Sequence, residues 1–417
     1  MALLPAALAN GVREAAERLR SAGHRSWLVG GAVRDLALEI APQDGDLATT
    51  ATPEEIERLF VSTHAVGKAF GTVVVRLGEI DLQVTTLRSE SSYADARRPA
   101  DVRFGTSLEE DAARRDFTCN ALYLVPETDE LVDPTGGWDD LAQRRLRCVG
   151  DAQRRFTEDG LRLLRLARLA AHYALEVERG TLAGAAASLA ALRGVSAERV
   201  LAELVRVAEG PDPGRALAIL LELGVLARLP GLGELGQADL QPRCAAVARL
   251  GPAPGAGAFF AALLRPASSE LARTALDALR ALRPKRALLE ACARAWALEP
   301  ELVLCQQGIA SGALRPSRWI RLVRDEAFDL ALVCWRAWHP LEGEQECTEL
   351  LRRARALGAA ERRPELFITS GELARAGVPR GPRWSELLRE AEDLQLDGEL
   401  TSPAQARAWL AERARER

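Results

Sequence analysis

The sequence predicts an α+β fold, in which a small mixed sheet with packed helices precedes a long helical remainder. Strand-like runs alternate with short helical stretches in the first 140 residues. After residue 137, leucine and alanine recur at the 3.6-residue spacing of helices. Proline and glycine gather at residues 210–214, 230–236 and 251–257, which we interpret as joints between groups of helices.

The elements of the first part follow from local patterns. Residues 1–20 predict an amphipathic helix, and Pro53–Phe60 predicts a short one. Runs rich in β-branched and aromatic residues predict strands at Ser26–Val29, 71–76 and Ile80–Thr86. We expect three parts, at residues 1–140, 141–211 and 212–417.

Composition excludes several classes of protein. The 417 residues carry a net charge of −4, which does not suit a general nucleic-acid coat. No apolar run is long enough to predict a membrane span. The seven cysteines form no CxxC pair, which favours scattered core residues in a reducing cytoplasm. Only Lys68 and Lys285 are lysines among 55 basic residues, and we interpret most of the arginines as compositional background.

A glycine pair and two carboxylates form the most informative stretch. Gly30 and Gly31 directly follow a predicted strand, where the backbone can turn sharply toward a ligand's phosphates. Asp44 and Asp46 are two residues apart, so on a strand both carboxylates lie on one face. Two such oxygen ligands suit Mg²⁺, and Asp81 on a later strand is a candidate third carboxylate. A surface turn is the alternative interpretation.

Ordered blocks continue this stretch along about half of the chain. Residues 28–49 read LVGGAVRDLALEIAPQDGDLAT, and further blocks lie at 70–72, 86–88, 93–99, 114–122, 133–137 and 155–162. Together they resemble the class II tRNA nucleotidyltransferase and bacterial poly(A) polymerase family, part of the DNA polymerase beta superfamily. The sequence departs from the family at Glu39-Ile40, where Gly-Arg is usual, at Gly45 and at Leu169.

The resemblance assigns roles to the three parts. By this resemblance, residues 1–140 correspond to a catalytic nucleotidyltransferase head. Residues 141–211 correspond to a helical neck that recognises the nucleotide. Residues 212–417 become a helical body and tail that we expect to bind tRNA, although residues 260–417 carry no readable motif.

Residues 114–120, RRDFTCN, combine cations, a carboxylate and an amide. Arg114 and Arg115 are suited to clamp triphosphate oxygens, with Arg34 as a further nucleotide-binding candidate. Asp116 and Asn120 are suited to bind a ribose hydroxyl. A solvated helix face is the alternative, and it explains the charges without the family order of the blocks.

Residues 158–162, EDGLR, are expected to open a helix, with Asp159 and Arg162 on one face. A carboxylate that accepts from an exocyclic amine, beside a guanidinium that donates to a ring nitrogen, suits cytosine and adenine and rejects uracil and guanine. The resemblance assigns this role to the pair, and Arg165 extends the edge or stacks. Residues 141–170 hold eight arginines against three acids, which favours a local phosphate-binding patch.

The resemblance implies template-free addition of CMP, CMP and AMP to the 3′ end of tRNA, from CTP and ATP with Mg²⁺. An A-adding or CC-adding specialist stays open, although residues 88–99 resemble a specificity-switching loop and argue against CC-only addition. A poly(A) polymerase is disfavoured, because residues 66–73 resemble the tRNA nucleotidyltransferases of the family more than its poly(A) polymerases. A tRNA-binding factor on an inactive scaffold is the non-enzymatic alternative. The sequence indicates no membrane association and no obligate protein partner.

Overall fold

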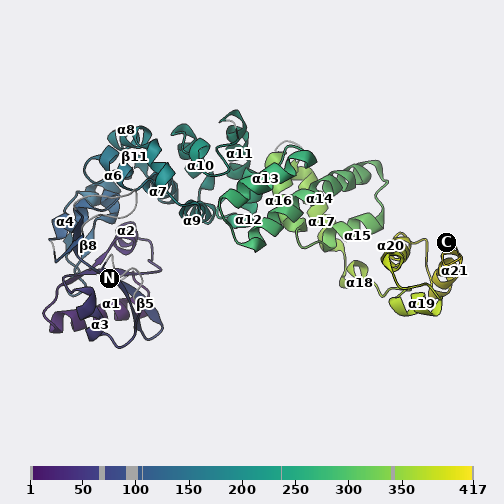
Figure 1. Ribbon diagram of the computed structural model, residues 1–417, viewed down its shortest axis with the longest axis horizontal. Coiled ribbons are helices and arrows are strands. Elements are labelled where there is room, and N and C mark those ends of the chain that lie inside the picture. Colours follow the sequence, from purple (N-terminus) through teal and green to yellow (C-terminus); the bar gives the residue numbers. More distant parts are fainter. Residues whose placement is uncertain are drawn as a thin grey trace. The chain divides into compact units, whose positions relative to one another are not determined.

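The computed structural model describes residues 3–64, 71–90, 102–105, 107–235, 237–339 and 343–415 (Figure 1). They form two compact units. The first contains residues 1–244 with the short segments 251–253 and 281–283, and the second contains 245–250, 254–280 and 284–417. The first unit holds the sheet and the second is helical, which confirms the α+β prediction.

A seven-stranded mixed sheet forms the centre of the first unit, in the order β3-β4-β5-β2-β1-β8-β9. Strand β2 is parallel to β5, and the other neighbours are antiparallel. The strands are β1 Ser26–Val29, β2 Asp46–Thr49, β3 Thr63–His64, β4 Thr72–Leu77, β5 Ile80–Thr86, β8 Tyr123–Leu124 and β9 Leu131–Val132. The predicted strands at Ser26–Val29 and Ile80–Thr86 are confirmed, and the one at 71–76 is shifted by one residue.

The two faces of the sheet have different neighbours. Helices α1 (Ala6–Ser21) and α3 (Pro53–Leu59) pack against strands β1, β4 and β5. A Cβ on Gly11 of α1 would lie 3.8 Å from Leu82, so α1 covers the face to which Leu82 points. Because side chains alternate along a strand, residues 81, 83 and 85 belong to the opposite face. That opposite face carries Asp46, whose partner in the β2–β5 register is Gln83.

Helical segments complete the first unit around this sheet. They are α2 Gly31–Ala37, α4 Leu108–Ala113, η2 Thr118–Asn120, α5 Gly137–Ala142, α6 Ala152–Glu158, α7 Leu161–His172, α8 Arg179–Ala187, η3 Leu189–Gly194, α9 Ala197–Ala208, α10 Pro213–Glu222 and η4 Leu226–Arg228. Two short strand pairs accompany them, β6 Arg88–Glu90 with β7 Val102–Phe104 and β10 Arg145–Leu146 with β11 Glu176–Val177.

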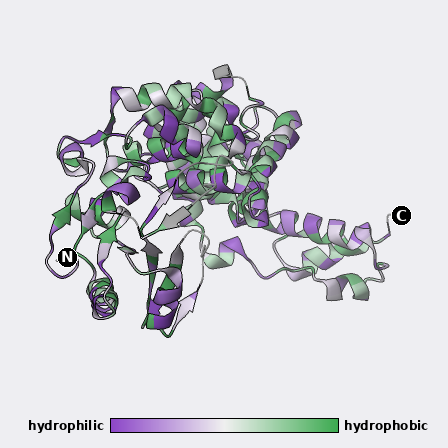
Figure 2. Cartoon of the chain, turned by 60° about the vertical axis from the view of Figure 1, so that its left-hand side comes forward, coloured by the Kyte–Doolittle hydropathy of each residue, from purple (hydrophilic) through white to green (hydrophobic). Residues whose placement is uncertain are grey.

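Amphipathic helices build the second unit, and individual helices in Figure 2 change between hydrophilic and hydrophobic colouring along their length. Its helical segments are α12 Gly255–Leu263, η5 Ser269–Leu271, α13 Ala272–Ala281, α14 Arg286–Ser311, α15 Pro316–Arg324, α16 Phe328–Trp338, α17 Gly343–Ala356, α18 Ala359–Arg362, α19 Ser370–Arg375, α20 Pro382–Leu396 and α21 Pro403–Arg413. Helix α11, Gln237–Arg249, runs across the division between the units.

The predicted joints and core residues occupy the expected places. Residues 210–214, 230–236 and 251–257 all fall where helices begin or end. All seven cysteines are free and buried, as expected for small core residues. Within the described residues, no helix combines the length and apolar character that a membrane span requires. The units divide the chain near residue 250, so the boundaries at 140 and 211 stay predictions.

Candidate functional site

Strands β1 and β2 place the glycine turn beside the carboxylate pair. Val29, the last residue of β1, is paired with Asp46, the first residue of β2. Gly30 then takes a left-handed conformation with φ of 70°. A Cβ there would lie 4.0 Å from Asp46 Oδ2 and 3.6 Å from Arg115 Nη1, so the backbone approaches both charged groups closely. Asp44 is exposed in the loop before the strand.

The electrostatics of the pair suit a hard divalent cation. Burial raises the pKa of Asp46 to about 6, the charge of Asp44 adds to this increase, and Arg115 opposes it. A buried carboxylate beside a second negative charge is stabilised by a cation held between them, and oxygen donors are those that Mg²⁺ takes. The donor set at Asp44 and Asp46 therefore fits the predicted metal.

Asp81 lies on the same face of the sheet as Asp46, two residues before Gln83 on β5. Its side chain is about half exposed, and its Oδ1 is 3.7 Å from Nε of Arg76 on the neighbouring strand. No cluster of three His, Cys, Asp or Glu side chains that suits a metal occurs in the described part of the chain. Asp44 is thus the acidic neighbour whose charge raises the pKa of Asp46, and Asp81 lies beside Arg76.

A buried carboxylate that the sequence analysis missed holds the two arginines of the RRD block. Arg114 donates from Nη2 to Asp111 Oδ1 at 2.6 Å, and Arg115 donates to Asp111 Oδ2 at 3.0 Å. The Tyr123 hydroxyl also donates to Oδ2 at 2.7 Å. Burial alone raises the pKa of Asp111, but these partners lower it to about 2. Its spacing of three and four residues from the arginines on a helix was the available signal.

Asp116, Asn120 and Arg34 form one hydrogen-bonded chain. Arg34 donates from Nη1 to Asn120 Oδ1 at 2.6 Å, and Asn120 donates from Nδ2 to Asp116 Oδ1 at 3.0 Å. Arg165 of α7 donates from Nε to Asp116 Oδ2 at 2.7 Å. Burial alone raises the pKa of Asp116, but Arg165 and the Asn120 bond hold it well below its usual range. The structure therefore brings together four residues that the sequence singled out.

The side chains of Asp159 and Arg162 bond to other groups, although the backbone N–H of Arg162 donates to the Asp159 carbonyl at 3.0 Å. Asp159 accepts two bonds from Arg199 of α9, from Nη1 at 3.2 Å and from Nη2 at 2.7 Å. Arg162 donates from Nη1 to Glu158 Oε2 at 3.0 Å and from Nη2 to the Arg114 carbonyl at 3.1 Å.

The expectation that residues 158–162 open one helix was wrong. Glu158 is the last residue of α6, and α7 begins at Leu161. The two helices are separated at Asp159, where the backbone is extended, and Gly160 lies against the backbone of Ala191 and Leu192, where a Cβ would clash.

Most arginines of the segment 141–170 form ion pairs. Asp140, which lies just outside the segment and is fully buried, holds Arg145 and Arg147. Glu203 of α9 is also buried and accepts from Arg168 at 2.7 Å. Acidic side chains from other elements thus neutralise much of the positive charge of this segment. Counting charges within the segment does not show this.

Parts of the family-like blocks lie outside the described residues. These parts are residues 65–70, at the start of the 70–72 block and within the 66–73 likeness, and residues 91–100, which contain the 93–99 block and most of the proposed specificity loop. Glu39, at one departure from the family, has a φ of 60°, a conformation that glycine adopts most easily.

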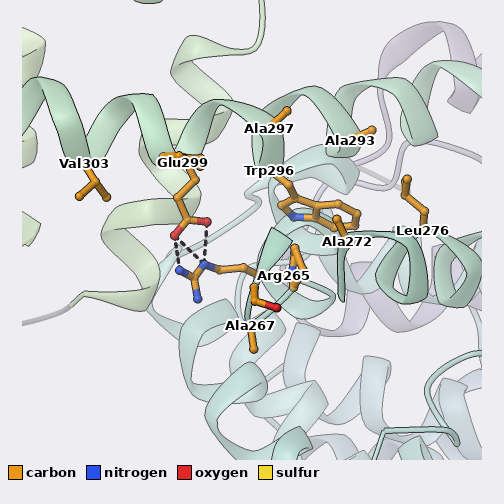
Figure 3. A pocket seen from close by; sticks show the side chains of 12 residues that line it. Arg265, Ala267, Ala272, Leu276, Ala293, Trp296, Ala297, Glu299 and Val303 are labelled. Carbon is orange, nitrogen blue, oxygen red and sulfur yellow. Dashed lines mark hydrogen bonds and ion pairs between the residues drawn. The ribbon is translucent and has the colours of Figure 1, made fainter. Parts of the chain in front are cut away.

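The second unit contains a cavity of about 460 Å³ that none of these residues lines (Figure 3). Its wall is mainly apolar, with Trp296 and several alanines. Arg265 and Glu299 form an ion pair at one side of it, with Nε 2.9 Å from both carboxylate oxygens.

Comparisons with known proteins identify relatives of this chain. The model of the poly A polymerase head domain matches residues 26–147. A curated relative from Geobacillus kaustophilus, named CCA-adding enzyme, is 34% identical over 414 residues and covers 95% of each chain. One from Bacillus velezensis with the same name is 41% identical over 223 residues, a match that covers 54% of this chain and 56% of the relative. The chain thus matches little more than half the length of that relative.

The structure also resembles a solved one. It matches the crystal structure of the Bacillus stearothermophilus CCA-adding enzyme in complex with CTP with a TM-score of 0.74. The two chains are 28% identical, and the match covers 97% of each. The similarity thus extends through both units and beyond the blocks that the sequence made readable.

Proposed function

This chain belongs to the family of CCA-adding enzymes, and we propose that it adds CMP, CMP and AMP to the 3′ end of tRNA, from CTP and ATP and without a nucleic-acid template. The observation that carries the proposal is the Asp44/Asp46 pair beside Gly30 and Arg115, in a chain similar to a CCA-adding enzyme over 95% of both lengths. A tRNA-binding factor without catalysis has no need of a carboxylate pair held in this way.

Asp44 and Asp46 are the proposed ligands of Mg²⁺. Bound there, the ion lowers the pKa of the attacking 3′-hydroxyl and stabilises charge on the phosphates. The turn at Gly30 lets the backbone approach the phosphates, because glycine adopts its φ of 70° easily and has no side chain in the way. Asp81 remains a candidate third carboxylate, and its place beside Arg76 supports a lesser contribution than that of Asp44 and Asp46.

The remaining site residues act on the incoming nucleotide. Arg114 and Arg115, held by Asp111, supply positive charge for the triphosphate, and Gly31 begins the helix that carries Arg34. Asp116 and Asn120 take the ribose hydroxyls, because they form a carboxylate–amide pair with a fixed orientation.

Asp159 and Arg162 take the base edge, with Arg165 one turn beyond Arg162. The Asp159 side chain is 20% exposed while it accepts from Arg199, so part of the carboxylate faces solvent. The two bonds from Arg199 hold that carboxylate in place as an acceptor for the amine of cytosine or adenine.

The division into a head at 1–140, a neck at 141–211 and a tRNA-binding body and tail at 212–417 is part of the proposal. So is a cytoplasmic location, which the seven free, buried cysteines support because reducing compartments keep thiols unpaired.

The decisive experiment replaces the carboxylates. We expect Asp44→Asn and Asp46→Asn to lower incorporation of labelled CMP into tRNA that lacks its 3′ end by about 1,000-fold, with tRNA binding unchanged. Asp139→Asn is the matched control, since Asp139 is an exposed aspartate of α5 in the same unit. Wild-type incorporation by Asp46→Asn would refute the assignment.

Substrates with staggered ends separate the related activities. Transfer RNAs ending before the first C, after one C and after both receive single labelled nucleotides. The proposal expects CMP on the first two and AMP on the third. AMP on the third alone would identify an A-adding enzyme, and CMP without AMP a CC-adding one.

A further inference from the structure

Tyr173 contacts the nucleotide-binding network, although no motif in the sequence includes it. It follows the last residue of α7 and is 8% exposed. Nη2 of Arg34 donates a hydrogen bond to its hydroxyl oxygen, and the guanidinium carbon lies 4.1 Å from the centre of its ring. The phenol therefore meets Arg34 both through its hydroxyl group and through its ring face.

Arg34 functions more as an internal connector than as an open cation. It is 7% exposed, and its Nε and both Nη atoms donate to protein groups. Besides Tyr173, it bonds Asp35 Oδ1 at 2.8 Å and Asn120 Oδ1 at 2.6 Å. The bond to Asn120 fixes which end of the amide faces Arg34, so Nδ2 is directed to Asp116.

The connection forms a closed loop through α7. Asp116 bonds Arg165, which lies eight residues before Tyr173 in the sequence. Eight residues of helix span about 12 Å. Helix α7 and the residue after it therefore contact this network at two points about two turns apart. Asn120 and Asp116 lie between these points.

From this geometry we propose that Tyr173 is a positioning residue for ribose recognition, which acts through Arg34 to fix the Asn120 amide and the Asp116 carboxylate. The inference rests on the proposed function, in which Asp116 and Asn120 take the ribose hydroxyls. Tyrosine suits this position because its hydroxyl oxygen accepts a hydrogen bond from Arg34 without carrying a charge. An acidic side chain there would add a second negative charge beside Asp35.

Burial keeps this phenol neutral, since it raises the pKa of Tyr173 to about 12. Without the hydroxyl, a buried N–H of Arg34 would lose its acceptor. Without the ring, Arg34 would also lose its flat support. Either change frees Arg34 to turn, and the orientation of Asn120 is then fixed by one fewer contact.

The test compares two substitutions with a neighbouring control. Tyr173→Phe removes only the hydroxyl, and Tyr173→Leu removes the ring as well. Ala174→Gly is the control, because Ala174 has a φ of 49° at the same turn and glycine adopts that conformation easily. Each purified protein is assayed for kcat/KM with CTP, dCTP and UTP on tRNA that lacks its 3′ end, and for its thermal unfolding midpoint.

We expect the CTP-to-dCTP preference to fall about threefold in Tyr173→Phe and about tenfold in Tyr173→Leu, since each loses part of the support of one hydrogen-bonding side chain. The CTP-to-UTP preference should stay at the wild-type level, because base selection rests on other residues. A general structural defect would lower all three rates together. Unchanged ribose preference in both variants would overturn the inference.

A double-mutant cycle tests the route through Asn120. In an Asn120→Ala background, Tyr173→Leu should change the ribose preference no further, whereas independent effects would multiply and contradict the inference. If Tyr173→Leu does not fold, Tyr173→Phe completes the same cycle. The proposed function fails separately, through a wild-type enzyme that incorporates no CMP.

Discussion

Arg162 is a residue whose chemical type matters more than its charge. Its planar guanidinium reaches Glu158, the Arg155 carbonyl and the Arg114 carbonyl at once. The last of these contacts links α7 to the segment of residues 114–120, the proposed binding site of the triphosphate. A lysine has three donors around a single point and does not present the same flat edge.

Replacement of this guanidinium should therefore damage nucleotide choice more than tRNA binding. We expect Arg162→Lys to raise incorporation of UMP relative to CMP about tenfold, since one oriented hydrogen-bonding group at the base edge is lost. Competition between CTP and UTP on one tRNA measures this ratio. Arg154→Lys is the control, because Arg154 also pairs with Glu158 but is exposed. Wild-type discrimination in Arg162→Lys would count against the base-edge role.

At the scale of elements, Asp111 ties three segments together. It lies on α4, accepts from the arginines that follow this helix, and accepts from Tyr123 on β8. With the side chain 1% exposed, the charge is stable only because these donors surround it. Arg114 and Arg115, the proposed ligands of the triphosphate, are thus held by a buried acid.

The bonds of Asp111 to Arg114, Arg115 and Tyr123 should make the free energy of unfolding depend on pH in the acid range. The pKa of Asp111 falls from 3.8 to about 2 on folding, so its stabilisation is complete above about pH 4 and is lost as the pH falls toward 2. It amounts to about 2 kcal/mol. Urea midpoints from pH 7 to 3 should therefore decline less steeply in Asp111→Asn than in wild type. Glu110→Gln, at an exposed neighbour, should keep the wild-type slope, and equal slopes in all three proteins would contradict the assignment.

The whole molecule contains two units with separate cores. Leu164 of α7 is fully buried in the first, and Leu332 of α16 lies in a core cluster of the second. Each unit is large enough to unfold as its own cooperative structure.

Calorimetry should therefore resolve two unfolding transitions. Leu164→Ala and Leu332→Ala each remove a buried side chain, which costs about 2–5 kcal/mol, and each should lower a different transition. A matched pair of exposed changes, Leu3→Ala and Leu304→Ala, should move neither. If either core substitution moves both transitions equally, the units do not unfold independently.

The strands at Ser26–Val29 and Ile80–Thr86, the helical remainder and the family-like blocks could all be predicted from the sequence. These features depend on residues close together in the chain, where periodicity and spacing act directly. For the same reason the glycine turn and the Asp44/Asp46 pair were readable, since a strand end and two nearby carboxylates form one local motif.

The partners of the charged side chains depend on the tertiary fold. The Asp159 carboxylate accepts from Arg199, forty residues away, and not from the side chain of the nearby Arg162, and Arg34 donates to Tyr173, 139 residues away. The chain is extended at Asp159, which separates α6 from α7, and Gly160 leaves room for the backbone of Ala191, a contact that helix propensity along the sequence did not reveal. A long side chain pairs with groups that are close in the folded structure, and its burial there changes its pKa. Neither the distance nor the burial can be read from the order of residues in the sequence.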